Sequence, residues 1–340
     1  MTATQEKRFV VLTTILRPTE AVRRFAALPG WQVVVVGDLK TPSDWRLPGV
    51  TYLGPQAQRD LFPGLAERLP WNHYARKNLG YLYAMSQGAD VIADTDDDNA
   101  PLPGWETSVP PPMASLPLVT SPPVANIYRL FTDEPIWPRG LPLDLVLSNE
   151  EIAIESAGPQ RVLALQGLVD GEPDVDAIYR LTAGRPVRFR HRDPVVLNEG
   201  VFAPSNSQNT LWRRQAFPFL YLPSFVTFRF TDILRGWVAQ RCLWTVGGRM
   251  AFGPATAIQE RNPHNLLRDF ESEIPCYLQS GPAIAALRAL RAPAHPADTT
   301  RACYEILEKV GITTTEETRL AHAWAQAACE AAASVASPST

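Results

Sequence analysis

Four aspartates fall within five residues in the run Asp94-Thr95-Asp96-Asp97-Asp98, which follows a short apolar segment. Carboxylates this close repel one another unless a cation or cationic side chains lie among them. In an extended chain residues i and i+2 face the same side, so Asp94, Asp96 and Asp98 are expected to converge while Asp97 faces elsewhere. Hard oxygen ligands suit Mg²⁺ or Mn²⁺, which take phosphate oxygens as further ligands. The run therefore predicts a divalent metal site. An exposed acidic turn or a Ca²⁺ loop is the alternative, although EF-hand spacing is absent.

A basic pair, Arg76 and Lys77, lies upstream, near the start of a helix predicted from His73 to Gln87. The N-terminus of a helix attracts anions through its free N–H groups and its dipole, and nearby cations strengthen that attraction. The pair therefore indicates a diphosphate site beside the acidic run, with His73 as an equal candidate for a diphosphate contact. A solvated first helical turn is the alternative.

A second helix is predicted from Thr231 to about Val246, with Thr231 as its N-cap and Asp232 in its first turn. The apolar stripe of this helix leaves Asp232 and Arg235 on its other side. Asp232 therefore either acts on a ligand or only serves the helix dipole.

The segments that must position these residues alternate between short apolar runs and helical patterns. Apolar runs that are buried on both faces and separated by helices predict a parallel sheet with crossover helices. Ligands of such open sheets bind beyond the carboxyl ends of the strands, where the acidic run lies. The first 100 residues therefore predict a Rossmann-like nucleotide-binding half. The predicted strands cover residues 9–14, 32–36, 50–53 and 89–93, and the helices between them cover 19–28 and 73–87.

The rest of the chain predicts a second half of the same domain and a helical extension. Residues 101–142 contain eleven prolines, too many for a helix or a central strand, and the aromatic residues between them favour packed irregular structure over disorder. With residues 143–280 as the second half, one domain would cover 1–280. Residues 281–340 are rich in Ala, Leu and Glu with helical periodicity and predict a helical C-terminal extension.

The composition of the 340-residue chain argues against several classes of protein. Its 32 basic and 35 acidic residues give a net charge of −3, which argues against a nucleic-acid binder that works by neutralising phosphates. Four scattered cysteines without a CxxC pair suit reduced thiols in the cytosol better than disulfides or a zinc site. The polar start of the chain and the apolar run of about six residues after it fit neither a signal peptide nor a transmembrane span. We therefore expect a soluble cytoplasmic protein.

Nine segments between residues 9 and 278 carry a family resemblance: Val11–Thr19, Val35–Asp38, Leu69–Tyr83, Asp94–Asn99, Trp137–Gly140, Gly171–Thr182, Ala203–Thr210, Arg229–Trp237 and Gln259–His264. In order and in sequence they resemble the STELLO group of glycosyltransferase-like proteins and, more distantly, the reversibly glycosylated polypeptides. The resemblance implies a GT-A fold, an α/β fold with a mixed central sheet, in which residues 143–280 form the acceptor-binding half. It also implies a glycosyltransferase that uses Mn²⁺ or Mg²⁺ to move a sugar from a nucleoside-diphosphate sugar, expected to be a UDP-sugar, to a glycan or another hydroxyl acceptor.

The resemblance also implies roles for single residues around the metal. Asp96 and Asp98 stand where GT-A enzymes carry the DxD motif, so they are the expected metal-facing pair, with Asp94 in support. Many GT-A folds have a late histidine that completes the metal shell, and His264 stands in that place. A structural or exposed histidine is the alternative for His264.

The ends of the first two predicted strands are implied contacts of the donor nucleotide. Thr13 and Arg17 follow the first strand, where such folds touch the nucleoside, and Asp38 ends the second. Asp38 either contacts the base or ribose or forms a turn after Gly37.

The implied acceptor side centres on Asp232, which stands where GT-A enzymes carry an acidic residue beside the acceptor. A base there would take the proton of the attacking hydroxyl in a single inverting displacement, whereas a retaining route needs no such base, and the sequence leaves both open. Asn209 is a candidate for positioning sugar hydroxyls, Trp212 for stacking on a sugar face and Arg235 for a further substrate contact. The alternative for the segment around Asn209 is a turn whose side chains cap backbone groups.

Two other functions stay open on the sequence. A nucleotide-sugar mutase of the reversibly glycosylated type would use the same metal site without an external acceptor. A non-catalytic glycosyltransferase-like partner of a polysaccharide synthase would need neither chemistry nor metal. Intact Asp96, Asp98, Asp232 and His264 argue against the second, because a degenerate scaffold has no need of all four.

Overall fold

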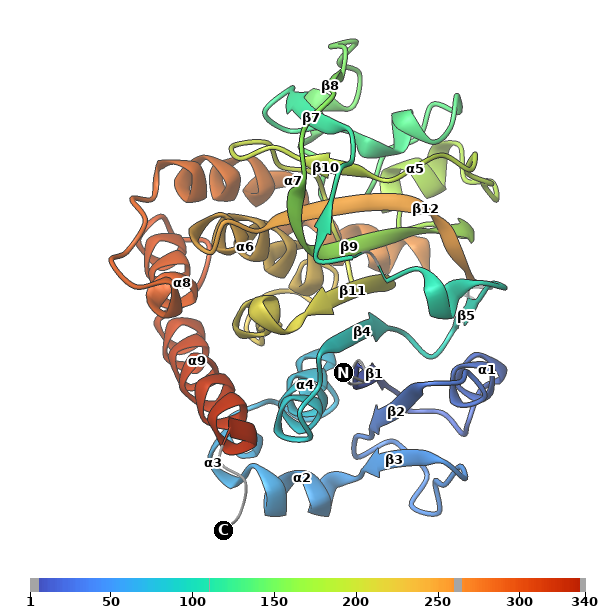
Figure 1. Ribbon diagram of the computed structural model, residues 1–340, viewed down its shortest axis with the longest axis vertical. Helices are drawn as coiled ribbons and strands as arrows, with labels where there is room; N and C mark the ends of the chain where they lie inside the picture. Colours follow the sequence, from blue (N-terminus) through green and yellow to red (C-terminus); the bar gives the residue numbers. More distant parts are fainter. Residues whose placement is uncertain (1–5, 110, 260–264, 337–340) are drawn as a thin grey trace.

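A computed structural model of the chain describes residues 6–109, 111–259 and 265–336. Within these residues one mixed twelve-stranded sheet crosses the molecule (Figure 1). Its strands are β1 (Arg8–Thr13), β2 (Trp31–Val36), β3 (Val50–Leu53), β4 (Val91–Thr95), β5 (Asn99–Pro101), β6 (Met113–Ala114), β7 (Leu118–Ser121), β8 (Ala153–Glu155), β9 (Gln160–Gly171), β10 (Val195–Leu197), β11 (Asn209–Arg213) and β12 (Arg249–Gln259). They pair in the order β3-β2-β1-β4-β11-β9-β12-β10-β7-β8, while β5 pairs with β12 and β6 with β9.

Helices cover both faces of this sheet, and the helices from the C-terminal part of the chain form a group at one side of the molecule (Figure 1). The α-helices are α1 (Glu20–Ala26), α2 (Pro55–Leu61), α3 (Pro63–Ala66), α4 (Lys77–Ser86), α5 (Ala177–Thr182), α6 (Thr231–Thr245), α7 (Leu266–Ala289), α8 (Thr299–Lys309) and α9 (Thr315–Ala336). Short 3₁₀ helices are η1 (Tyr74–Arg76), η2 (Trp105–Thr107), η3 (Ile127–Leu130), η4 (Leu143–Leu145), η5 (Arg214–Phe219) and η6 (Pro296–Asp298).

The N-terminal half is the parallel part of the sheet, as its continuous apolar runs predict. Strand β1 pairs in parallel with β2 and β4, and β2 pairs in parallel with β3. Helix α1 buries Phe25 against one face of these strands, and α4 buries Leu79 and Leu82 against the other. A Cβ on Gly80 would lie 2.6 Å from a methyl group of Val11, so glycine lets α4 lie close to β1. This packing fixes the carboxyl ends of β1, β2 and β4 at one edge.

The sheet changes direction beyond β4. Strand β11 pairs antiparallel with both β4 and β9, and β9 pairs in parallel with β12. The turn after β4, which carries the acidic run, therefore lies beside the start of β11 and the end of β12. The predicted α/β fold class with a mixed central sheet is confirmed.

Two predicted helix starts are corrected. The helix predicted from His73 to Gln87 is divided into η1 and α4, because the His73 side chain accepts a hydrogen bond from the Ala75 N–H and caps the short first turn. The helix predicted with Thr231 as its N-cap has Phe230 at that position, without a side-chain cap. Thr231 is its first helical residue, and its hydroxyl donates to the Thr227 carbonyl at 3.3 Å.

The described part of the proline-rich segment, residues 101–142, contains only short strands and 3₁₀ turns, and it buries Trp105, Ile127, Phe131 and Ile136. Helix α7 crosses the boundary that the sequence predicts between residues 280 and 281, and the division into domains stays a prediction. Helices α8 and α9 lie along one side of the molecule, so the predicted helical character of the C-terminal residues is confirmed for these two segments (Figure 1). Of the helices described, none combines the length and apolarity needed to cross a membrane.

Candidate active site

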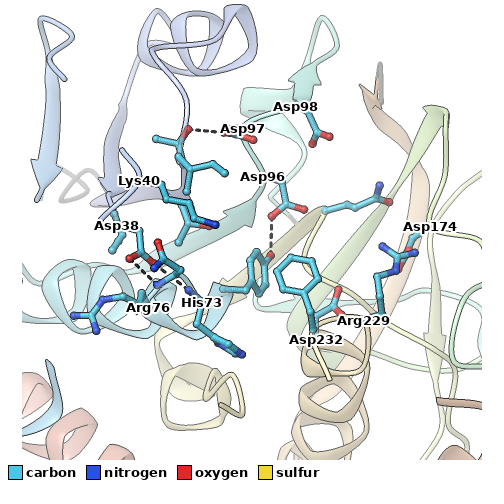
Figure 2. A pocket seen from close by; sticks show the side chains of 18 of the residues that line it. Asp38, Lys40, His73, Arg76, Asp96, Asp97, Asp98, Asp174, Arg229 and Asp232 are labelled. Carbon is cyan, nitrogen blue, oxygen red and sulfur yellow. Dashed lines mark hydrogen bonds between the residues drawn. The ribbon is translucent and has the colours of Figure 1, made fainter. Parts of the chain in front are cut away.

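A cavity of about 330 Å³ opens at the carboxyl ends of the parallel strands. Its walls come from the ends of β1 and β2, the acidic turn after β4, the turn before α4, and the start of α6 (Figure 2). The cavity therefore joins residues from both halves of the sheet, at the edge where α/β folds bind ligands.

The acidic turn borders the cavity with three of its four aspartates. Asp96 accepts hydrogen bonds at its Oδ1 from the Tyr74 hydroxyl at 2.7 Å and from Lys77 at 3.0 Å. Asp97 accepts from the hydroxyl of Thr14, and the Gln259 amide donates to Asp98 Oδ2 at 2.9 Å. Each aspartate thus accepts a hydrogen bond from a side chain of another element.

The prediction that Asp94, Asp96 and Asp98 converge while Asp97 faces elsewhere is wrong. Strand β4 ends at Thr95, so the alternation of a strand does not continue into the turn. Asp96, Asp97 and Asp98 all line the cavity, whereas Asp94 is fully buried behind them.

Asp94 belongs to a buried network of charges beneath the turn. Lys77 Nζ lies 2.9 Å from Asp94 Oδ1, and Arg235 Nη2 lies 2.8 Å from Asp94 Oδ2, with all three side chains at most 1% exposed. Lys77 also donates to the Thr95 carbonyl at 2.6 Å. Burial lowers the pKa of Lys77, but Asp94 and Asp96 outweigh it and raise the pKa. Lys77 therefore stays charged and anchors the turn.

Several predicted ligand contacts are corrected by this arrangement. Lys77 and Arg235 do not line the cavity, because both bind Asp94. Arg76 borders the cavity, but its guanidinium is fully buried and donates to Gln58 and to the carbonyls of Ala66 and Leu69. Lys77 is therefore engaged by the acidic turn, and a diphosphate contact of Arg76 stays a prediction.

The predicted sugar contacts of Asn209 and Trp212 are also corrected. Trp212 is 1% exposed and lies under the guanidinium of Arg235, 5.0 Å from ring centre to guanidinium carbon, so its faces are not open to a sugar. The Asn209 side chain accepts from the Trp105 indole at 2.8 Å and donates to the Thr256 hydroxyl at 2.8 Å. Both residues are therefore part of the packing around β11.

The pKa of Asp96 is shifted by its surroundings. Burial raises the pKa of Asp96 to about 6, against the opposing effects of Lys77 and Tyr74, and the charge of Asp98 adds to the rise. Burial likewise raises the pKa of Asp97. A cation at the turn would favour the ionised carboxylates.

The far wall of the cavity contains an ion-paired cluster that the sequence did not predict. Arg139 donates to both oxygens of Asp174 at 2.8 Å and to both oxygens of Asp232 at 3.0 and 2.9 Å. Arg139 lies in the segment Trp137–Gly140 and Asp174 in Gly171–Thr182, so both are inside the family resemblance, but only their charge within an apolar, proline-rich setting hinted at a role.

Asp232 lines the cavity, as its prediction as an acceptor-side residue requires. Burial raises the pKa of Asp232, but the two hydrogen bonds and the charge of Arg139 outweigh burial and lower it. The carboxylate is therefore ionised at neutral pH and only weakly basic.

The nucleoside side of the cavity lies at the ends of β1 and β2. Thr13 and Asp38 line it, together with His73, which the sequence offered as a diphosphate contact, and Asn72, which the sequence did not single out. Arg17 does not line it: its side chain is mostly exposed and pairs with Asp44 at 3.2 Å. The nucleoside contact of Arg17 therefore stays a prediction.

The predicted metal site lies only partly within the residues that the structure describes. His264 lies outside the described residues. Within the residues that are described, no group of three His, Cys, Asp or Glu side chains is arranged to hold a metal ion.

Comparison with known proteins gives the same family that the sequence suggests. Residues 229–323 match the family model described as STELLO glycosyltransferases. The chain is 34% identical over 273 residues to Probable glycosyltransferase STELLO1 of Arabidopsis thaliana, which covers 74% of this chain and 35% of that protein. It is 33% identical over 309 residues to Probable glycosyltransferase STELLO2 of the same plant, in an alignment that covers 85% of this chain and 40% of that protein. The chain thus spans well under half the length of these relatives.

Solved structures give weaker likenesses. Glucosyl-3-phosphoglycerate synthase from Mycobacterium tuberculosis, in complex with Mn²⁺, UDP and glucosyl-3-phosphoglycerate, has a TM-score of 0.41 at 10% identity over 85% of this chain and 82% of that one. The same enzyme with Mn²⁺, UDP-glucose and phosphoglyceric acid has a TM-score of 0.40 at 10% identity over 81% and 79%. These values carry no argument about ligands. The STELLO family model and the two plant relatives, in contrast, confirm the resemblance to the STELLO glycosyltransferases that the sequence predicts.

Proposed function

We propose that the chain transfers a sugar from a nucleoside-diphosphate sugar, with a UDP-sugar as the expected donor, to a hydroxyl group of a glycan or another acceptor. The proposal rests chiefly on one observation, the composition of a single cavity. One side of this cavity is formed by the ends of β1 and β2, the other side contains the carboxylate of Asp232, and the acidic turn with Asp96 and Asp98 lies between the two sides. This arrangement offers a diphosphate site between a nucleoside side and an acceptor side. The printed names of the two plant relatives support the reaction class.

The acidic turn is the proposed site of a divalent cation. Asp96 and Asp98 would hold the ion, because both border the cavity and hard carboxylate oxygens suit Mg²⁺ or Mn²⁺. Burial is the main cause of the raised pKa of Asp96 and the charge of Asp98 adds to it, and a cation at the turn would offset both effects. Mg²⁺ is commonly held by one or two carboxylates together with substrate phosphates, so the donor would supply further ligands. When bound, the ion would neutralise charge that develops on the diphosphate leaving group.

Asp232 is the proposed acceptor-side base. Arg139 fixes its carboxylate through two hydrogen bonds and keeps it ionised, so it can accept a hydrogen bond from the attacking hydroxyl. The low basicity that Arg139 imposes means that the hydroxyl would lose its proton only as its oxygen bonds to the anomeric carbon. A single inverting displacement is the expected outcome of this route.

The first test is donor binding. Calorimetric titration with UDP-, GDP-, TDP- and CMP-sugars in Mn²⁺, and again in EDTA, should find a donor whose affinity depends on the metal. Asp98→Asn should weaken that donor at least about tenfold in Mn²⁺ and leave the weak binding in EDTA unchanged. Asp44→Asn, a change at a mostly exposed carboxylate, is the matched control.

The outcomes of this test separate two errors. If no sugar nucleotide binds under either condition, the proposed function is wrong. If Asp98→Asn binds the donor with the metal dependence of the wild type, the metal assignment is wrong. Mass spectrometry of products from a labelled donor, with and without a hydroxyl acceptor, then distinguishes transfer from rearrangement of the donor sugar.

A further inference from the structure

The turn formed by Asn72 and His73 is held by the carboxylate of Asp38. Asp38 Oδ1 accepts from the N–H groups of Leu39 at 2.7 Å and Asn72 at 2.8 Å, and Oδ2 accepts from the N–H of His73 at 3.1 Å. Asn72 has a φ of +53° and is the one residue other than glycine with positive φ among those described. Asp38 therefore uses both oxygens to fix this turn, and the side chains that the turn presents become the candidates for ligand contact (Figure 2).

His73 has a fixed tautomer. Its Nδ1 accepts a hydrogen bond from the Ala75 N–H at 3.0 Å, so Nδ1 carries no proton and the neutral ring bears its proton on Nε2. Burial lowers the pKa of His73, against the opposing charge of Asp38, so the ring is neutral at pH 7. His73 borders the cavity, and no described residue accepts a hydrogen bond from its Nε2. His73 thus offers the cavity a donor and no acceptor.

We infer that the Nε2–H of His73 selects donors whose nucleobase carries a ring carbonyl, as in uracil, over bases with an amino group in its place. The inference rests on the proposed function and deepens it. It follows from position, because the Asn72–His73 turn and the ends of β1 and β2 form the wall on the parallel side of the sheet, where a nucleoside would lie.

The chemistry of the two base types gives the selection its direction. A carbonyl oxygen accepts from Nε2–H, whereas an amino group would meet it donor to donor. The opposite tautomer would accept from the amino group, but its Nδ1–H would then oppose the Ala75 N–H. An unpaired donor of this kind costs enough to change affinity by about tenfold or more.

UDP and CDP test the inference, because their bases differ only at C4, which bears a carbonyl in uracil and an amino group in cytosine, and at the adjacent N3, which carries a proton in uracil alone. Calorimetric titration of the full chain in Mn²⁺ should give a dissociation constant for UDP about tenfold or more below that for CDP. His73→Asn keeps an oxygen near the Nδ1 position to cap the Ala75 N–H and removes the donor at Nε2. This variant should weaken UDP and bring the ratio of the two constants close to one.

A matched control comes from Lys40, an exposed residue that lines the same side of the cavity. Lys40→Met removes a charge that acts alike on both nucleotides, so UDP and CDP should weaken together and their ratio should be kept. The unfolding temperature of each variant checks that it is folded.

Equal affinities of UDP and CDP for the wild type, or an unchanged ratio in folded His73→Asn, would overturn the inference and leave the proposed function standing. Failure of every nucleoside diphosphate to bind the wild type would overturn the proposed function and the inference with it. Equal affinities of UDP and CDP for the wild type would overturn the inference even if His73→Asn does not fold.

Discussion

Asp232 has an uncommon setting for a proton acceptor. A general base works best with a pKa near the working pH, yet Arg139 lowers the pKa of Asp232 from its ordinary value. The same ion pair fixes the direction of the carboxylate toward the cavity wall. The position of Asp232 at the cavity therefore favours a role as base, whereas its lowered pKa argues against that role. An experiment can decide between these two arguments.

Asp232→Asn keeps the size of the side chain and one acceptor for Arg139 but removes the charge. We expect the rate of sugar transfer to fall by about a hundredfold or more, with donor affinity within about twofold of the wild type, because the base acts on the acceptor alone. Single-turnover rates and donor titrations measure the two quantities.

The control for this prediction is Asp174→Asn, which removes the other carboxylate bound to Arg139. If both variants lose the same rate, Arg139 and its network matter and Asp232 is not a base. If Asp232→Asn keeps the wild-type rate, the inverting route through Asp232 is wrong and a retaining route gains support.

Residues that are adjacent in the chain could be found from the sequence, and residues that meet only through the fold could not. The acidic run of Asp94 to Asp98 repels itself in any conformation, so its need for a cation or for cationic side chains was visible. Arg139, in contrast, binds Asp232, which is 93 residues away, through packing that no local pattern encodes. The same holds for Trp212, whose amphipathic side chain suggested a sugar platform before its burial was known.

Helix α5 is held at its start by Asp176, whose carboxylate is mostly buried. The carboxylate accepts from the Tyr179 N–H at 2.8 Å and from the Trp137 indole at 2.7 Å. Burial raises the pKa of Asp176 to about 6, these two hydrogen bonds lower it, and the carboxylates of Glu273 and Asp174 add to the rise. The folded protein therefore binds this proton more tightly than the unfolded chain does.

This shift predicts a pH dependence of the free energy of unfolding. Because the folded pKa lies above the unfolded value of about 3.9, the contribution of Asp176 is fully present below pH 4 and is lost as pH rises through 6. Asp176→Asn keeps an acceptor for the helix cap and stays neutral. Urea unfolding should show the variant gaining about 2–3 kcal/mol relative to the wild type between pH 4 and pH 7.

Asp60→Asn, at an exposed helix residue, should show no such gain. A variant at Asp176 whose stability follows the wild type over the whole range would contradict the assigned pKa shift. Burial of the helix cap, rather than its charge, would then hold α5 in place.

Elements of the parallel half were predictable because burial on both faces leaves a continuous apolar run, as in β1 and β2. The strands of the antiparallel half were less predictable from the sequence. Strand β9 contains Gln166 and Gly167 in its buried stretch, where Gln166 binds Asn206 and Gly167 leaves room for Asn209. These polar and small residues interrupt the apolar pattern, and only their tertiary partners explain them.

At the scale of the whole molecule, the C-terminal helix α9 packs directly on helix α4 of the parallel half. Trp324 of α9 is fully buried, with its ring centroid 6.4 Å from that of Tyr81 on α4 and 6.0 Å from that of Tyr221. Its indole donates to the Pro218 carbonyl at 3.0 Å. Helix α4 also supplies Lys77, the cation that anchors the acidic turn. The same helix therefore contacts both α9 and the acidic turn.

We therefore expect the extension and the site to unfold together. Trp324→Ala should lower the free energy of unfolding by about 3–5 kcal/mol, because it leaves a large cavity and unpairs the Pro218 carbonyl. Gln326→Ala, at an exposed position of the same helix, should change it by less than about 0.5 kcal/mol. Helical circular dichroism and binding of the donor nucleotide, followed through one urea titration, should be lost in a single transition for both variants. An early loss of helical signal with donor binding intact would instead make residues 281–340 an independently folding unit, because α9 could then leave α4 without releasing Lys77 from the acidic turn.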